Sequence, residues 1–255
     1  MDNRTIYAAA LRQSAIDLAC DTGDFTRQTP VCVLSRTNDK ARRYLSLPFS
    51  LQLVSYGSNV VASASPALLE TAKSYIDGKP PYRCFETPSI HRLDAMLSPF
   101  GQKVCFMAEY FLPDIDRLTV RECAYPTRLL TQKDFADLYK PEWSNALCEK
   151  RKALDVLGIA AFDKDEMIGF AACSADCDEM WQIGIDVLPA YRRKGIASHL
   201  TAALAVEILR RGKVPFYCAA WSNIPSVRNA VRCGFVPAWV ELTAKDNAFV
   251  TQMNA

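Results

Sequence analysis

One short run of the sequence combines residue types that suit the binding of a polyanion. An apolar stretch ends at Pro189, three consecutive cations follow at Arg192, Arg193 and Lys194, and Gly195 then precedes a helical pattern. The first turn of a helix has unpaired backbone N–H groups and a partial positive charge. Glycine allows a ligand to approach that backbone closely. The run therefore indicates a pyrophosphate site, with a solvated strand-to-helix turn as the simpler alternative.

The run differs from two common nucleotide-binding loops. The Walker pattern Gly-x-x-x-x-Gly-Lys-Ser/Thr is absent, and the dinucleotide fingerprint needs more than the single glycine found at this turn. A second element lies downstream, where Asn223-Ile-Pro-Ser226 opens a short helical segment that ends at Gly234-Phe235. The two elements are separated by an expected helix and strand.

Taken together, the two elements resemble the GNAT superfamily of N-acetyltransferases. The family carries Gln/Arg-x-x-Gly-x-Gly/Ala after a strand ending Val-x-Pro, and residues 192–197 follow Val187-Leu-Pro189 in this order. The family's Asn-x-x-Ala/Ser helix, which ends in Gly-Phe, corresponds to the element that begins at Asn223. The resemblance covers about residues 128–245.

The resemblance implies that acetyl-CoA is the cosubstrate and that its acetyl group passes to an amine by direct attack. Such a donor needs a phosphate cradle and a sheet edge for its extended arm. The backbone of Asp186 and Val187 is expected beside the pantetheine, with Asn223 and Ser226 assisting. The full set of expected donor-binding residues is Asp186, Val187, Arg192, Arg193, Lys194, Gly195, Ile196, Ala197, Ser198, Asn223 and Ser226.

The catalytic acid and base are where the chain departs from the family. Many members carry a Tyr seven residues after the Asn, a position that is Ala230 here. A carboxylate used by other members corresponds to Trp181. Glu179 lies on the same side of the expected strand as Trp181. It is the first candidate for the base that removes the amine proton, directly or through water. The alternative is that Glu179 is a solvated turn residue. Tyr217 and Tyr191 are candidates to protonate the leaving thiolate.

The surrounding pattern predicts an α+β (mixed α/β) fold, with a GNAT-type central mixed β-sheet flanked by helices and an additional N-terminal α/β domain. The proline-bracketed segment 113–126 is the expected boundary, between residues 1–120, of unassigned role, and residues 121–255, the GNAT domain. Strands are expected at 31–35, 51–56, 59–64, 104–111, 158–162, 167–173, 181–188, 214–220 and 235–243. Helices are expected at 4–20, 66–76, 90–97, 132–139, 143–152, 196–211 and 225–233.

Composition excludes several classes of function. The 30 basic and 28 acidic residues among 255 leave a net charge of +2, so bulk attraction to nucleic acid or a membrane surface is not expected. No apolar run is long enough to span a bilayer, and the N-terminus lacks a signal-peptide pattern. The ten cysteines include no C-x-x-C pair, and we expect reduced thiols in a cytoplasmic protein without a metal site.

We therefore expect a cytoplasmic acetyl-CoA-dependent N-acetyltransferase that acts on an unidentified, small amine. A non-catalytic acyl-CoA sensor or interaction protein on the same fold is the alternative, favoured by the missing Tyr at Ala230. Transfer of an amino acid from aminoacyl-tRNA is a further alternative, which the near-neutral charge disfavours. The N-terminal part is expected either to roof the acceptor site or to form a homodimer.

Overall fold

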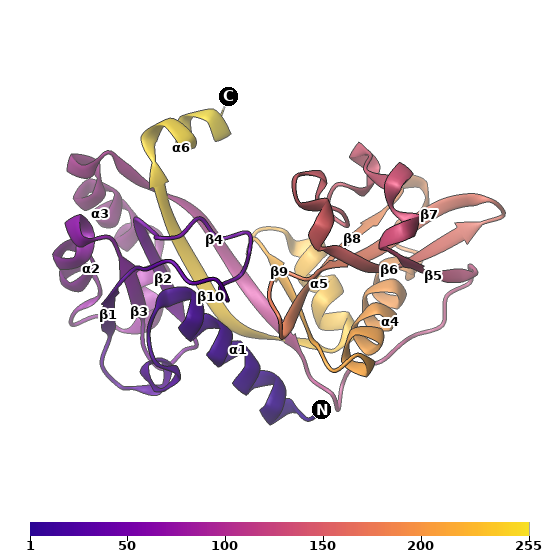
Figure 1. Ribbon diagram of the computed structural model, residues 1–255, viewed down its shortest axis with the longest axis horizontal. Helices are drawn as coiled ribbons and strands as arrows, with labels where there is room; N and C mark the ends of the chain where they lie inside the picture. Colours follow the sequence, from indigo (N-terminus) through magenta and orange to yellow (C-terminus); the bar gives the residue numbers. More distant parts are fainter. Residues whose placement is uncertain (255) are drawn as a thin grey trace. The chain divides into compact units, whose positions relative to one another are not determined.

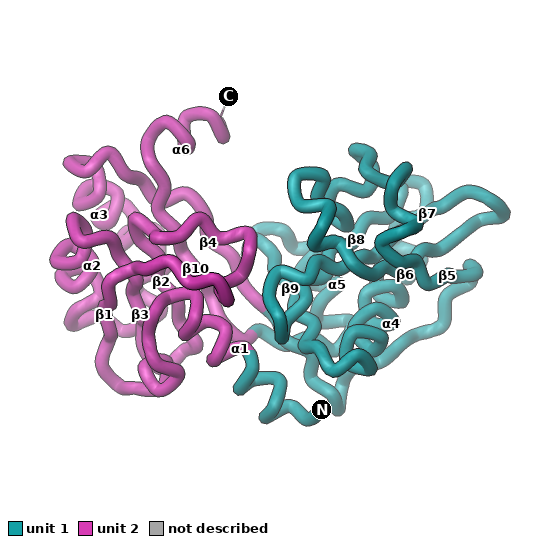
Figure 2. The backbone as a smooth tube through the Cα atoms, in the orientation of Figure 1, with its two compact units in different colours: residues 1–9, 111–237 teal, residues 10–110, 238–255 magenta. Residues whose placement is uncertain are grey.

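The computed structural model describes residues 1–254, which form two compact units built from segments far apart in the sequence (Figure 2). Unit 1 comprises residues 1–9 and 111–237, and unit 2 comprises residues 10–110 and 238–255. Three elements have residues in both units: α1 (Asn3–Leu18), β4 (Gln102–Pro113) and β10 (Phe235–Asp246). The boundary near residue 120 stays a prediction.

The strands of unit 1 follow the order β4-β9-β8-β7-β6-β5. Their bounds are β5 (Thr127–Thr131), β6 (Asp155–Asp163), β7 (Glu166–Ser174), β8 (Met180–Val187) and β9 (Val214–Ala219). Neighbours from β5 to β8 are antiparallel, whereas β8 and β9 are parallel. A parallel pair needs a long crossover, which is supplied by α4 (Ile196–Arg210) (Figure 1).

One stripe of α4 fixes this helix against the sheet. Ile196, Leu200, Leu204 and Ile208 repeat every four residues and are at most 1% exposed, which places them on one helix face. They belong to a core cluster that also holds residues of β6, β7, β8 and α5 (Ile224–Cys233). The first turn of α4 is thereby held at the end of β8.

The segment between β5 and β6 is less regular than the sequence pattern suggested. The helices predicted at 132–139 and 143–152 are wrong, because this segment forms short 3₁₀ turns at Gln132–Asp134, Ala136–Leu138, Pro141–Trp143 and Glu149–Leu154. A proline within the segment lacks a backbone donor and disfavours a continuous helix. Phe135, Trp143 and Leu147 still supply buried side chains, which cluster with Phe170 of β7.

Unit 2 has the strand order β1-β3-β2-β10-β4. The predicted hairpin is confirmed, since β2 (Leu51–Ser55) and β3 (Val61–Ala64) are antiparallel, and β1 (Val31–Leu34) joins β3 in parallel. The helices are α2 (Leu69–Ile76), α3 (Thr87–Leu97) and α6 (Asn247–Met253), of which the sequence pattern had not indicated the last. The predicted α+β class, with a large mixed sheet flanked by helices, is confirmed.

Candidate functional site

The loop before α4 takes two left-handed backbone conformations. The φ angles of Arg193 and Gly195 are 63° and 83°. An added Cβ at Gly195 would meet nothing within 4 Å, so the backbone angle rather than lack of space favours glycine there. The amide of His199 donates to the carbonyl of Gly195 at 3.1 Å, the first i→i−4 bond of the helix. The amides of residues 196–198 precede that bond and have no carbonyl of an earlier helical turn to pair with.

Side chains of the same loop hold it against the end of β8. The Arg192 Nε donates to the carbonyl of Val187 at 3.0 Å, and the Lys194 Nζ lies 4.7 Å from the centre of the Tyr191 ring. The hydroxyl of Tyr191 donates to the Asp163 carboxylate at 2.9 Å, which raises the pKa of this phenol to about 12. The loop is therefore braced before any ligand arrives.

The pairing between β8 and β9 ends partway along the strands. It joins Met180 with Val214, Trp181 with Pro215 and Gln182 with Phe216, and within the described part of the chain it goes no further. β8 continues to Val187 with β7 on its other side. A strand edge that lacks a neighbour can pair with an extended ligand through its backbone groups. Asp186 and Val187 lie on this edge, next to residues 188–195, which connect β8 to α4 and are called the cradle loop below.

Tyr217 of β9 lies just beyond the last pair of that ladder. Its side chain is buried, and its hydroxyl shares a 2.7 Å hydrogen bond with the Ser226 Oγ of α5, in which either group can be the donor. Burial raises the pKa of Tyr217, partly offset by the hydrogen bonds to Ser226 and Asn229. The phenol is therefore protonated at neutral pH.

The helix face that Tyr217 meets includes the position where many family members have their Tyr. Ser226, Asn229 and Ala230 are spaced i, i+3 and i+4, so they share one face of α5. Ala230 is fully buried. A phenol from the neighbouring strand thus reaches this face, which sequence spacing along the helix alone did not reveal.

Two predicted donor-binding side chains already make bonds within the protein. The Asn223 Oδ1 accepts from the Ser226 amide at 3.3 Å as the N-cap of α5, and the Ser198 hydroxyl donates to the Gly195 carbonyl at 2.9 Å. The cap leaves the Nδ2 donor of Asn223 for another partner. For Ser198, the backbone amide rather than the hydroxyl is the group suited to a phosphate.

The face of β8 opposite α4 holds a loop that sequence reasoning did not place. The Asp186 carboxylate accepts from the amides of Asn145 and Ala146, both at 2.9 Å. A Cβ at Gly184 would clash with the carbonyl oxygen of Asn145, so only glycine permits this approach. The isolated glycine within a predicted strand was the available signal.

The predicted base lies at the other end of β8. Glu179 is exposed and directly precedes the strand, and its carbonyl accepts from the Val214 amide at 2.9 Å. This is the end at which β8 and β9 are still paired, whereas Tyr217 lies where the pairing has ended. The catalytic role of Glu179 stays a prediction.

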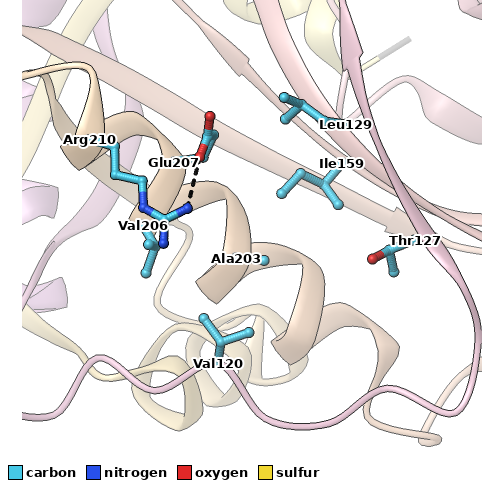
Figure 3. Close-up of a pocket in the computed structure, with 8 residues that line it drawn as sticks. All are labelled: Val120, Thr127, Leu129, Ile159, Ala203, Val206, Glu207 and Arg210. Atoms are coloured by element: carbon cyan, nitrogen blue, oxygen red, sulfur yellow. Dashed lines mark hydrogen bonds and ion pairs between the residues drawn. The ribbon is translucent and has the colours of Figure 1, made fainter.

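A hollow of about 480 Å³ lies along the second half of α4. Its lining is mainly aliphatic, including Val120, Leu129 and Val206, with the Glu207–Arg210 ion pair at its rim (Figure 3). It is lined by the second half of α4, whereas the loop that precedes α4 contributes no residue to its lining.

Three further observations concern residues 1–254. No three His, Cys, Asp or Glu side chains are grouped as metal ligands. No helix in that range has the length and apolar character needed to cross a bilayer. All ten cysteines are free thiols, and Cys84, Cys173, Cys177 and Cys233 are buried.

Comparison with known proteins identifies the class of this site. Residues 123–235 match the model of the acetyltransferase (GNAT) family. This part of the chain is therefore a GNAT acetyltransferase domain, and the predicted family is confirmed. A search of curated proteins finds no match.

Similar solved structures include three bacterial proteins. A putative GNAT acetyltransferase from Novosphingobium aromaticivorans is 17% identical, with a TM-score of 0.42, and the match covers 56% of this chain and 66% of that protein. A GNAT acetyltransferase from Colwellia psychrerythraea is 15% identical, with a TM-score of 0.44 and coverage of 56% and 57%. A GCN5-related N-acetyltransferase-like protein from Streptococcus suis is 18% identical, with a TM-score of 0.47 and coverage of 76% and 83%.

Proposed function

We propose that the protein is an acetyl-CoA-dependent N-acetyltransferase that acts on the amine of a small molecule in the cytoplasm. The observation that carries this proposal is the position of the cradle loop. Within the GNAT domain, this loop directly follows the stretch of β8 that β9 leaves unpaired. In the coenzyme a diphosphate is covalently joined to an extended arm that contains amides. The cradle loop would bind the diphosphate, and the adjoining unpaired stretch of β8 would bind the arm.

The donor would be bound mainly by the backbone. The amides from about Arg193 to Ser198 would bind the pyrophosphate, assisted by the positive charges of Arg192, Arg193 and Lys194. The backbone of Asp186 and Val187 would pair with the pantetheine arm as an added strand does. The Nδ2 of Asn223 would donate to a carbonyl of that arm.

The reaction forms a carbon–nitrogen bond and breaks a carbon–sulfur bond. A neutral amine attacks the thioester carbonyl, loses a proton, and releases the coenzyme as a thiolate that takes up a proton. In this proposal Tyr217 gives its proton to the thiolate, because its phenol is protonated, buried and beside the point where the pairing of β8 with β9 ends. Glu179 would accept the amine proton through water, because three residues of extended strand, or about 10 Å, separate it from Gln182, where the pairing with β9 ends.

Thermal unfolding with and without acetyl-CoA tests donor binding. At 100 times its dissociation constant the donor would add about 2.7 kcal/mol, a rise of about 2–4 °C in Tm for this size. Gly195→Trp places a side chain at a φ of 83°, a backbone conformation that strains any residue other than glycine, and should abolish the rise. Gly212→Trp is the matched control, because Gly212 also has a positive φ of 71° and open space around it.

Retention of the rise in Gly195→Trp, or its absence in the folded wild-type protein, would exclude this donor site. With binding established, a screen of small amines with mass-spectrometric detection of the N-acetylated product tests turnover. Donor binding without turnover of any amine would favour the sensor, the alternative that rests on Ala230 in place of the usual Tyr.

A further inference from the structure

The outer edge of β5 is open. β5 stands at the end of the strand order of unit 1, and among the described residues its strand neighbour is β6 alone. The strand is mostly exposed, and Leu129 at its middle is 47% exposed. An edge strand presents a row of backbone N–H and C=O groups with which a strand of another chain can pair. This edge is therefore a candidate interaction surface.

Hydrogen bonds at the two ends of β5 show which of its backbone groups face outward. The Phe162 amide of β6 donates to the carbonyl of Pro126 at 2.9 Å, so the residue before β5 faces β6. At the other end, the Thr131 amide donates to the Asp134 carboxylate at 2.8 Å instead of to β6. The direction of the backbone groups alternates along an antiparallel strand. The residues whose groups face the outer edge are therefore Thr127, Leu129 and Thr131.

The Leu129 side chain adds an apolar surface beside this edge. It lines the hollow along the second half of α4, together with Val120 and Val206 (Figure 3). Val120 is also well exposed, at 43%. Exposed aliphatic side chains that adjoin an open strand edge are typical of a surface that another chain covers.

The sequence of β5 suits pairing with a second copy of the same strand. In an antiparallel pair centred on Leu129, the outward amide and carbonyl of Leu129 bond reciprocally with those of Leu129 in the second copy. Thr127 then lies opposite Thr131 of the second copy, which is a favourable cross-strand pair. Arg128 is the only charged residue of β5 and lies opposite Leu130 of the second copy. No like charges therefore meet across the pair.

The two neighbouring registers suit the strand less well. A pair centred on Arg128 would place two guanidinium groups directly opposite each other, which is unfavourable. A pair centred on Leu130 would place Leu129 opposite Thr131 of the second copy, whose amide already donates to Asp134. The register centred on Leu129 is therefore the one that combines reciprocal hydrogen bonds with separated charges.

We propose that two copies of the protein associate through β5, as an antiparallel strand pair with its twofold axis at Leu129. The contact lies in unit 1 and does not depend on the proposed acetyl donor. A strand of five residues with an adjoining aliphatic patch makes a small interface, and small interfaces give weak association. The dimer is therefore in equilibrium with the monomer.

Sedimentation velocity at protein concentrations from about 1 to 300 µM tests the association. The wild-type protein should shift towards the dimer as the concentration rises. Leu129→Arg removes the apolar contact and places two cations at the axis, so this variant should stay monomeric. A wild-type protein that remains monomeric throughout the range would overturn the proposal.

Leu34→Arg is the matched control. Leu34 is also an exposed leucine, at 38%, and it lies in β1, the strand at the opposite end of the strand order. This variant should dimerise as the wild-type protein does. Loss of the dimer in Leu34→Arg, or its retention in Leu129→Arg, would assign the contact to another surface and overturn the proposal.

Disulfide cross-linking tests the register with a smaller substitution that keeps the strand apolar. Leu129→Cys places two thiols opposite each other at a Cα separation of about 5.5 Å, which a disulfide can bridge. Oxidation should therefore give a covalent dimer on a non-reducing gel. Thr127→Cys should not cross-link with itself, because it lies opposite Thr131, but an equal mixture of Thr127→Cys and Thr131→Cys should cross-link.

The wild-type protein, oxidised in parallel, gives the background from the ten native cysteines. Cross-linking of Leu129→Cys above this background, with none for Thr127→Cys alone, is the expected result. Equal cross-linking of these two variants, or none by Leu129→Cys, would overturn the proposed pairing.

Discussion

Asp186 and Asn145 are joined by two hydrogen bonds. The Asn145 backbone amide donates to the Asp186 Oδ2 at 2.9 Å, and its side-chain Nδ2 donates to the Oδ1 at 2.7 Å. Asp186, whose backbone lies on the edge expected to pair with the pantetheine arm, thereby holds the loop that contains Asn145 on the face of β8 opposite α4. The backbone of Asp186 belongs to the strand edge expected to bind the acetyl donor, whereas its carboxylate holds the loop that contains Asn145.

Replacing this carboxylate should release the loop. In Asp186→Ala, the amides of Asn145 and Ala146 lose their acceptor, and we expect their hydrogen exchange to become about tenfold faster. Hydrogen-exchange mass spectrometry of the peptide that spans residues 141–150 measures this. Asp137→Ala removes an exposed carboxylate from a nearby 3₁₀ turn and should leave the exchange unchanged. Unaltered exchange in Asp186→Ala would show that other contacts hold the loop.

A methyl group at Gly184 should disturb the same contact sterically. Gly184→Ala places a Cβ against the Asn145 carbonyl, and we expect a loss of about 1–3 kcal/mol in unfolding free energy. Urea denaturation measures the loss. In Gly23→Ala no atom lies within 4 Å of the new Cβ, so this control should change little. The effects of Gly184→Ala and Asp186→Ala should be less than additive, because both displace one loop; strict additivity would contradict the shared cause.

Removal of the Tyr217 hydroxyl should slow turnover without weakening donor binding. Loss of a general acid typically costs about 10²–10⁴-fold in rate, so Tyr217→Phe should lower kcat by at least about 100-fold once an acceptor is known. Tyr191→Phe is the comparison, because its phenol is held by Asp163 in the loop. A larger loss of kcat in Tyr191→Phe would reverse the assignment of the proton donor.

The pH dependence of stability should carry a contribution from Asp155. This buried carboxylate accepts from the Cys148 amide at 3.0 Å and the Tyr139 hydroxyl at 3.2 Å, but desolvation raises its pKa to about 6. The folded protein therefore holds this proton more tightly than the unfolded chain. The unfavourable contribution is absent below about pH 4, grows between pH 4 and 6, and is complete at pH 7.

Asp155→Asn should consequently stabilise the protein at pH 7 by about 1–3 kcal/mol and have little effect at pH 4. Urea denaturation at the two pH values measures the difference. Asp165→Asn, in an exposed turn, should show no such dependence. A variant Asp155→Asn that is equally destabilised at both pH values would indicate that the hydrogen bonds of the carboxylate outweigh its desolvation.

The sequence predicted the elements that carry long buried stripes or strong turn signals. Helix α4, with apolar residues every four positions and Gly212 after its end, was predicted within a residue at each end. Strand β5 was missed, because its residues are mostly exposed and show no alternation of buried and exposed positions. The segment after β5 has apolar residues of the right kind for helices, but the tertiary packing of Phe135 and Trp143 requires only short turns.

The same distinction holds for the site. The cradle depends on backbone geometry at adjacent residues, so a local motif sufficed to indicate Gly195 and its neighbours. The contact of Tyr217 with Ser226 joins two elements, and that of Asp186 with Asn145 joins residues 41 positions apart. Such pairs depend on the register of strands, which a single sequence specifies poorly.

In unit 2, β10 lies between β2 and β4. β2 and β4 therefore cannot complete their pairing until β10, which follows both of them along the chain, has been synthesised. Until about residue 246 has left the ribosome, β2 and β4 each present an edge without its native neighbour, and five residue pairs between β10 and β2 are missing. The N-terminal half of this protein is therefore translated first but completes its sheet late, and during that interval its exposed strand edges are the sites where chaperones or other chains would bind.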